Sequence, residues 1–312
     1  MKAAVIGSGL IGRSWAMVFA RGGHDVSLWD KDATQVEKAL ASIAQTLPLM
    51  ADAELIDDPQ SIRARIKGAA TLAQALDGAG FVQENITELA APKQKLFAEI
   101  ETLVSADAVL SSSTSAIMPS IIFSALKTRD RCIVSHPMNP PHLAPIVELC
   151  GASFTSAPAL ETARIFMAGC GMAPIMVKRE IEGFILNRLQ LAVLNEAFRL
   201  IADGYVSADD LDITIKEGLA LRWSFMGPIE TIDLNAPQGV ADYLVRYGPT
   251  IRRIGMSQSV AKPWPDTVGD VLDAEMRAKV PRDKLNDATA WRDRRLMALA
   301  VHKRQAEKKS LS

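Results

Sequence analysis

The sequence predicts an α/β protein in which an N-terminal, doubly wound and mainly parallel sheet precedes an all-helical region. Residues 1–30 read as a strand, a glycine-rich turn, a helix and a second strand. Apolar runs of strand length then alternate with helical stretches as far as residue 177. Beyond residue 177 the pattern is helical only, so we expect domains of residues 1–180 and 181–312.

The first thirty residues contain the parts of a dinucleotide site in the required order. A strand, a glycine turn, a helix and a second strand are expected at residues 2–6, 7–12, 13–21 and 24–29. Gly7 permits a tight turn, Gly9 lets the backbone approach a pyrophosphate, and Gly12 lets the helix pack closely on the strand. The free amides at the start of this helix would then face the phosphates.

Asp30 ends the second strand and predicts which dinucleotide binds. Its carboxylate can accept hydrogen bonds from ribose hydroxyls and repels a 2′-phosphate, so NAD is favoured over NADP. The adjacent Lys31 works against that repulsion. Three glycines alone often form only a turn, but the strands, helix and acid around these favour a cofactor site.

The rest of the first domain continues the alternation. Helices are expected at residues 34–50, 61–68, 71–76 and 91–103, and strands at residues 80–83, 108–110, 131–135, 145–149 and 173–177. Polar residues follow several strand ends, namely Asp30, Glu84, Ser115 and His136. Because ligands of such sheets bind outside the carboxyl ends of the strands, this edge is the expected site.

Long helices are expected after residue 180. They cover residues 182–203, 208–218 and 239–247, with further helical pieces to residue 309. Their apolar side chains exceed what one small bundle buries, including Phe184, Leu191, Leu194 and Phe198. We therefore expect a homodimer formed through this domain.

Composition excludes several classes of function. The formal net charge of −1 gives no electrostatic case for a nucleic acid or an acidic membrane surface. No apolar run approaches the roughly 20 residues of a membrane helix, and the first strand leaves no room for a signal peptide. Cys132, Cys150 and Cys170 lack paired spacing, which predicts buried reduced thiols in a cytoplasmic protein and no metal site.

His136 is the residue best suited to moving a proton. It follows a strand, precedes a proline-rich turn and titrates near neutral pH. Glu148, on the next expected strand, could hold the far ring nitrogen and stabilise the imidazolium. The alternative is that His136 is a turn residue with a satisfied hydrogen bond.

Two further polar features need explanation. Ser115 ends a run of five hydroxyl residues, of which a helix cap would explain only one. Asn187 lies in an otherwise apolar helical stretch, where asparagine needs a local partner or a ligand.

With these residues in place, the chain resembles the L-3-hydroxyacyl-CoA dehydrogenase family over about residues 2–250. Within the family it is most similar to the lambda-crystallin / L-gulonate 3-dehydrogenase branch. The motifs that carry the resemblance are Ser111-Ser-Ser-Thr-Ser115, His136-Pro-Met-Asn-Pro-Pro141, Val147-Glu-Leu149, Glu182-Gly-Phe-Ile-Leu-Asn-Arg-Leu-Gln190 and Gly227-Pro-Ile-Glu-Thr-Ile-Asp-Leu-Asn-Ala236. The resemblance implies an oxidoreductase linked to fatty acid metabolism.

The resemblance also implies roles at the substrate end of the site. His136 would be the catalytic base, with Glu148 as its partner. Ser115 and Asn187 would hydrogen-bond the substrate oxygens, and Asn139 would support the loop.

At the cofactor end, the resemblance implies that Leu10 and Ile11 contact NAD through their backbone amides. Asp30 would hold the adenosine ribose. Glu88 and Lys93 would lie near the nicotinamide half.

One departure from the acyl-CoA enzymes concerns the substrate. They carry a small, glycine-rich run before a shared Met-Gly-Pro, where this chain has Leu221-Arg-Trp-Ser-Phe225. Arg222 could bind a free carboxylate or belong to a solvated helix face, and Arg188 is a second candidate for the carboxylate.

We expect NAD-dependent oxidation of the 3-hydroxyl of a small L-3-hydroxy acid to the 3-keto acid. One alternative is a dehydrogenase of a short 3-hydroxyacyl-CoA such as 3-hydroxybutyryl-CoA. The other is an NAD-binding structural protein of the crystallin type, against which the full set of His136, Glu148, Ser115 and Asn187 argues.

Overall fold

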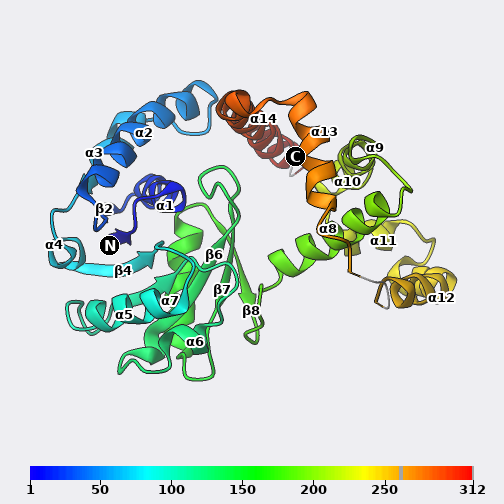
Figure 1. The fold of residues 1–312 in the computed structure, drawn as a ribbon. Helices are drawn as coiled ribbons and strands as arrows, with labels where there is room; N and C mark the ends of the chain where they lie inside the picture. Colours follow the sequence, from blue (N-terminus) through cyan, green and yellow to red (C-terminus); the bar gives the residue numbers. More distant parts are fainter. Residues whose placement is uncertain (260–262, 311–312) are drawn as a thin grey trace. The chain divides into compact units, whose positions relative to one another are not determined.

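The computed structural model describes residues 1–259 and 263–310, and the chain divides into two compact units (Figure 1). The first unit comprises Met1–Arg188 and the described residues from Arg292 onward, and the second comprises Leu189–Trp291. The sequence placed all residues from 181 to 312 in one domain, whereas the structure groups residues 181–188 and most of the last helix with the first unit. Met297 is the reason, because its side chain is buried in the core of that unit.

An eight-stranded sheet organises the first unit, in the order β3-β2-β1-β4-β5-β6-β7-β8. The strands are β1 Lys2–Ile6, β2 Asp25–Trp29, β3 Ile66–Gly68, β4 Ala79–Glu84, β5 Val109–Ser112, β6 Cys132–Pro137, β7 Ile146–Cys150 and β8 Ala173–Val177. All neighbours pair in parallel except β6 and β7. The predicted fold class, with a mainly parallel sheet, is confirmed.

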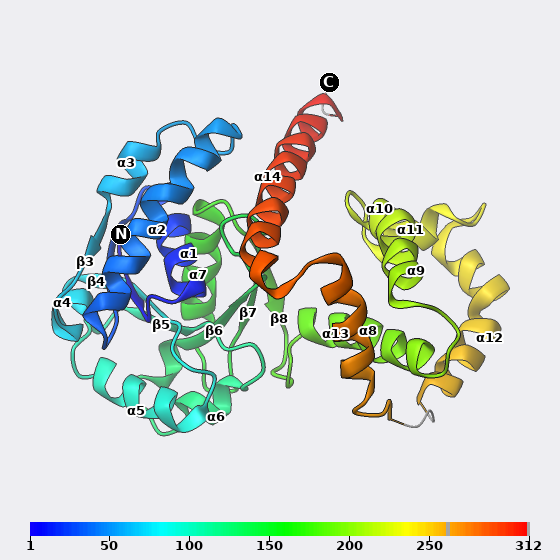
Figure 2. The ribbon, with the colours of Figure 1, turned by 45° about the horizontal axis from the view of Figure 1, so that its top comes forward.

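Helices cover both faces of this sheet (Figure 2). They are α1 Leu10–Arg21, α2 Ala33–Asp52, α3 Pro59–Ala64, α4 Leu72–Leu76, α5 Ala90–Ile100, α6 Pro119–Phe123 and α7 Ala157–Gly169. In β1, Ala3 and Val5 face α1, α2 and α7, whereas Ala4 and Ile6 face α4, α5 and α6. Burial on both faces explains why the strands read as continuous apolar runs.

One local expectation in the first unit is wrong. The helix expected at residues 61–68 ends at Ala64, and Ile66–Gly68 pairs with β2 as an edge strand. Three residues are too few to show a strand pattern in the sequence. In addition, β7 runs antiparallel to β6, because the loop between them is too short for the crossover that parallel strands need.

The helices from residue 186 onward complete the described chain. They are α8 Leu186–Ala202, α9 Ala208–Ile213, a π-helix Thr214–Leu219, α10 Ala220–Trp223, α11 Pro228–Leu234, α12 Gly239–Ser259, α13 Val268–Lys279 and α14 Leu285–Ser310. α8 begins four residues later than expected because Gly183 and Phe184 both have positive φ, which the helical conformation excludes. No helix within the described ranges is both long and apolar enough to cross a membrane.

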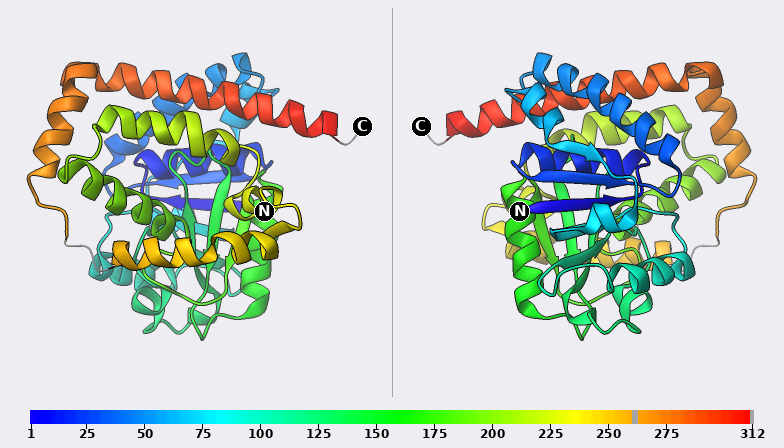
Figure 3. Two further views of the ribbon diagram at one scale, coloured as in Figure 1. Left: turned by 90° about the vertical axis from the view of Figure 1, so that its right-hand side faces the viewer. Right: turned by 90° about the vertical axis from the view of Figure 1, so that its left-hand side faces the viewer.

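The end of α14 packs against α2 in the first unit. In both views of Figure 3 the red helix α14 runs past the blue helix α2, and residues of both helices line one cavity. Arg304 donates a hydrogen bond to the carbonyl of Glu54 near the end of α2, and Met297 is buried beside Leu47 and Met50 in the same core cluster. The chain therefore returns to the first unit after the second unit.

Candidate active site

His136 and Glu148 face each other across the antiparallel pair β6 and β7, where they are register partners. His136 Nδ1 lies 2.8 Å from Glu148 Oε2, and both side chains are buried. Because a carboxylate only accepts hydrogen bonds, Nδ1 carries the proton and Nε2 keeps its lone pair. The pair thus has the geometry of a general base whose partner sets its tautomer.

The start of α8 holds the second oxygen of Glu148. Oε1 accepts hydrogen bonds from the amides of Ile185 and Leu186, at 2.9 and 3.0 Å. Amides at a helix start have no partner within the helix, and the helix dipole there favours negative charge. The buried Phe184 ring, whose centroid is 5.6 Å from that of His136, covers the imidazole. These contacts fix the orientation of the pair.

Asn187 and Ser115 meet in the structure. The Asn187 amide donates to the Ser115 carbonyl oxygen at 2.8 Å. Asn187 lies in the first turn of α8 and not in the helix interior that the sequence had suggested. Its partner Ser115 is distant in the sequence. The amides at the start of α8 also bind Glu148. Through α8, Asn187 and its partner Ser115 are therefore linked to the His136–Glu148 pair.

Glu88 holds the loop that carries Ser115. Its Oε1 accepts from the Thr114 hydroxyl and the Ser115 amide, both at 2.6 Å. Its Oε2 lies 3.4 Å from the ammonium of Lys93. The predicted cofactor residues Glu88 and Lys93 are therefore neighbours, and Glu88 joins them to the loop that carries Ser115.

Lys93 has a second acidic partner, Glu84, whose role was not predicted. Lys93 Nζ donates to both Glu84 oxygens, at 2.8 and 3.0 Å, and both side chains are buried. Burial raises the pKa of Glu84, and the Lys93 charge opposes that rise. The available sequence signal was a glutamate at the very end of an apolar strand.

Ser113 is another residue that sequence reasoning passed over. Its hydroxyl accepts from Trp15 Nε1 at 2.9 Å and Gln83 Nε2 at 2.7 Å, and donates to Asn85 Oδ1 at 2.7 Å. This junction ties α1 to the ends of β4 and β5. These hydrogen bonds explain why the run of hydroxyl residues at 111–115 includes a serine at position 113.

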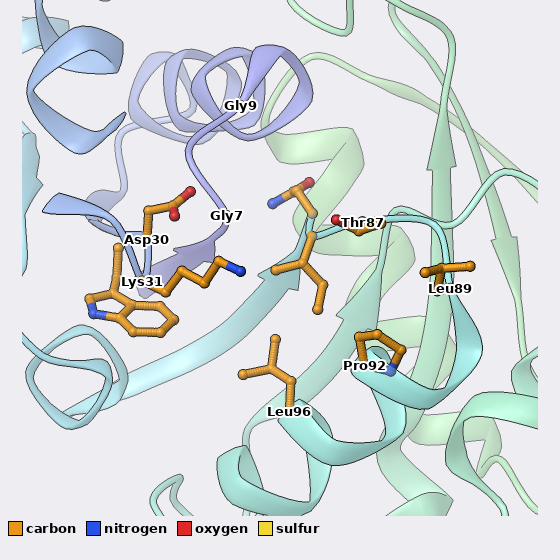
Figure 4. A pocket seen from close by; sticks show the side chains of 11 residues that line it. Gly7, Gly9, Asp30, Lys31, Thr87, Leu89, Pro92 and Leu96 are labelled. Carbon is orange, nitrogen blue, oxygen red and sulfur yellow. The ribbon is translucent and has the colours of Figure 1, made fainter. Parts of the chain in front are cut away.

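A cavity of about 460 Å³ opens at the glycine turn, between Asp30 and the segment of residues 85–87 (Figure 4). Gly7 has φ +90°, and a Cβ on Gly12 would lie 1.8 Å from the Gly7 carbonyl oxygen. Gly9 has nothing within 4 Å of its Cβ position, so its backbone is open to a ligand. Leu10 and Ile11 open α1, where the amides lack helical partners. This cavity therefore suits a dinucleotide phosphate.

Asp30 lines this cavity while supporting the glycine turn. Its Oδ2 accepts from the Ser8 amide at 2.8 Å and the Ser8 hydroxyl at 3.2 Å. Lys31 also lines the cavity (Figure 4). The carboxylate thus holds the glycine turn and also lines the cavity.

The remaining candidates lie outside these networks. Asn139 is exposed in the loop after His136 and precedes Pro140 in a cis peptide bond. Arg188 is exposed in the first turn of α8, and Arg222 is exposed on α10 in the second unit. The three cysteines are buried and free, and burial raises the pKa of each thiol to about 12, so they are unsuited to act as nucleophiles.

His142 is a second buried histidine, outside the active site. Its Nδ1 lies 3.1 Å from the Ser14 hydroxyl oxygen, and that hydroxyl donates to the Leu10 carbonyl. Burial lowers the pKa of His142 to about 4 from 6.5. The imidazole is therefore neutral in the folded protein at neutral pH.

His142 should make folding stability depend on pH. Below pH 6.5 the unfolded chain binds a proton that the folded chain excludes until about pH 4, so stability falls across this window as pH falls. The loss should reach roughly 3 kcal/mol at most. His142→Gln should reduce this slope in urea unfolding between pH 7 and 4.5, and the exposed His302→Gln should not. Equal slopes in all three proteins would contradict the assignment.

Two family models match the chain. One describes the NAD-binding domain of 3-hydroxyacyl-CoA dehydrogenase and matches residues 2–181, and the other describes its C-terminal domain and matches residues 183–262. The lambda-crystallin homolog of Homo sapiens is 37% identical over 308 residues, which cover 97% of this chain and 96% of the relative. An L-carnitine dehydrogenase of Pseudomonas putida is 36% identical over 251 residues, which cover 80% of this chain and 77% of the relative.

The fold also matches solved structures. One is the NAD⁺-dependent dismutase 5-formyl-3-hydroxy-2-methylpyridine 4-carboxylic acid 5-dehydrogenase, with a TM-score of 0.81 and 25% identity. The match covers 96% of each chain. The matches to the human lambda-crystallin homolog and to this dehydrogenase structure therefore extend over nearly the whole sequence.

Proposed function

Because this chain belongs to the 3-hydroxyacyl-CoA dehydrogenase family and is an NAD-dependent oxidoreductase, we propose that it oxidises the 3-hydroxyl of a small L-3-hydroxy acid to the 3-keto acid. L-Gulonate is the model substrate. The observation that supports the chemistry is the buried His136–Glu148 pair, whose free Nε2 can accept a proton.

In the proposed reaction His136 Nε2 takes the proton of the substrate hydroxyl. Glu148 stabilises the resulting imidazolium through Nδ1, and the amides at the start of α8 hold Glu148 in its orientation. Asn187 and Ser115 orient the substrate oxygens. The glycine turn and Asp30 would hold NAD, which when bound would supply the acceptor for the hydride that leaves C3.

Two observations favour a free acid over a thioester. Arg222 and Arg188 are exposed guanidinium groups, and a guanidinium matches a carboxylate in shape and charge. Relatives named for L-carnitine and for a pyridine carboxylic acid act on small carboxylates. The test is a panel of L-gulonate, L-carnitine, L-3-hydroxybutyrate and 3-hydroxybutyryl-CoA with NAD, followed by NADH absorbance. Preference for the thioester would support the acyl-CoA alternative. A complete lack of turnover would support the structural-protein alternative.

Arg222→Met should raise KM for the preferred free acid by about tenfold or more, because a carboxylate loses a charged partner. KM for the CoA thioester should change little, since its C1 carries no charge. Arg188→Met is the matched comparison, and whichever variant shows the larger change identifies the carboxylate ligand. Unaltered KM values in both variants would remove this argument for a free acid.

Asp30 should set the preference for NAD. Asp30→Asn keeps an acceptor for the Ser8 amide but removes the charge, so it should weaken NAD binding modestly and raise the use of NADP. Lys31→Met should have the opposite effect and increase the preference for NAD over NADP. Ratios of kcat/KM for the two coenzymes measure both effects. Equal use of both coenzymes by the unaltered enzyme would contradict the assignment.

We also propose a homodimer formed through the helical region. Large apolar side chains are exposed in the second unit, namely Leu191, Leu234, Val245 and Met256 on its helices and Phe225 in the turn after α10. Phe184, which had supported this expectation, is instead buried in the first unit. A monomer in sedimentation at low micromolar concentration would count against the dimer.

A further inference from the structure

Ser8 lies between Gly7 and Gly9 in the glycine turn, and its side chain contacts Asp30. Gly7 and Gly9 line the cavity at this turn, whereas Ser8 is only 3% exposed. The Ser8 amide donates to Asp30 Oδ2 at 2.8 Å, and the Ser8 hydroxyl donates to the same oxygen at 3.2 Å. Every residue except proline would supply the amide. The hydroxyl is therefore the part of this contact that depends on the amino acid at position 8.

Three donors from two elements hold the Asp30 carboxylate. Ser8 contributes two of them to Oδ2, and the amide of Asp32 donates to Oδ1 at 3.1 Å. Asp32 is the N-cap of α2, where its own side chain accepts from the Thr34 amide at 2.9 Å. Hydrogen bonds to a charged group are stronger than those between neutral groups, so each of these bonds resists rotation of the carboxylate. Asp30 is thus fixed between the glycine turn and the start of α2.

A fixed carboxylate excludes a 2′-phosphate more strictly than a mobile one. In the proposed complex Asp30 holds the adenosine ribose, and NADP carries a negatively charged phosphate on that ribose. Turning the Asp30 side chain away would relieve the repulsion, but it would break the hydrogen bonds to Ser8. Lys31 lines the same cavity and would attract the phosphate. The orientation of Asp30 therefore decides between repulsion and attraction.

We propose that Ser8 is a positioning residue that sets how strictly the protein excludes NADP. Its hydroxyl holds Asp30 in the orientation that repels a 2′-phosphate, and its effect on the coenzyme passes through Asp30. This inference rests on the proposed binding of NAD at the glycine turn. It assigns a role to the side chain at a position where the glycine pattern itself specifies none.

The test compares the Kd values of NADH and NADPH by fluorescence titration, which needs no substrate. Ser8→Ala removes the hydroxyl and keeps the amide bond to Asp30. It should lower the preference for NADH over NADPH about tenfold, because turning Asp30 away then breaks one fewer hydrogen bond to a charged group. Most of the change should be tighter binding of NADPH. An unaltered preference in the folded variant would overturn the inference.

A second background separates positioning from direct contact with the coenzyme. In Asp30→Ala the Ser8 hydroxyl has no carboxylate to hold, so adding Ser8→Ala should leave the preference as it is in Asp30→Ala alone. If Ser8→Ala lowers the preference equally in both backgrounds, the hydroxyl acts on the coenzyme directly and the inference is wrong.

The control for lost stability is Thr46→Ala, which removes a half-buried hydroxyl that donates to the Ser42 carbonyl within α2 at 2.9 Å. It should keep the full preference for NADH even if its Tm falls as far as that of Ser8→Ala. Ser8→Gly also lacks the hydroxyl and replaces Ser8→Ala if that variant does not fold. Failure of the unaltered protein to bind NADH would instead overturn the proposed function.

Discussion

His136→Ala is expected to lower kcat by roughly 100-fold or more, the usual effect of losing a general base. His136 Nε2 is the proton acceptor in the proposed reaction, and its Nδ1 is already engaged by Glu148. NADH affinity should barely change, because the histidine has no contact with the glycine turn or with Asp30. Steady-state rates with the preferred hydroxy acid and fluorescence titration with NADH measure the two effects separately.

The control for this experiment is His302→Ala, which removes an exposed histidine from α14. It should retain full activity. Because His136→Ala leaves Glu148 Oε2 without its partner, unfolding should be measured as well, to show that the variant is folded. Turnover close to that of the unaltered enzyme in a folded His136→Ala protein would show that another group takes the proton.

Glu148→Gln should lower kcat by about 10³-fold or more through the tautomer of His136. The glutamine carbonyl can still accept from the amides of Ile185 and Leu186, so the start of α8 stays in place. Its NH₂ group then faces Nδ1, which must act as acceptor, and the proton moves to Nε2. A protonated Nε2 on a neutral imidazole cannot take the substrate proton.

The matched control is Glu99→Gln on the exposed side of α5, which should be fully active. NMR of the imidazole nitrogens would report the tautomer directly in Glu148→Gln. If the variant keeps normal turnover, or if Nδ1 still carries the proton, the role assigned to Glu148 is wrong.

Much of the fold was predictable because its signals are local. Alternating apolar strands and helices indicated the sheet, and Gly7, Gly9 and Gly12 indicated a turn whose close packing the structure shows directly. His136 and Glu148 were recognisable from residue type and from their places on successive strands. The sequence pattern did not indicate that these strands run antiparallel, which makes the two residues register partners.

The late start of α8 shows a limit of periodic patterns. Residues 182–185 fit the apolar spacing of a helix, yet Gly183 and Phe184 adopt positive φ. This break turns the amides of Ile185 and Leu186 toward Glu148 and buries Phe184 beneath His136. Long-range contacts outweigh the local preference at this point, and periodicity does not report them.

By itself, the sequence determined the fold class and the glycine turn with Asp30, and it indicated His136 and Glu148 as the candidates for proton transfer. Only the tertiary structure decided which side chains share a hydrogen bond or a charge. Glu84 lies nine residues from Lys93, and Ser115 lies 72 residues from Asn187, so no local pattern joins either pair. The physical reason is that strand and helix patterns record burial, whereas the partner of a buried polar group depends on how distant segments pack.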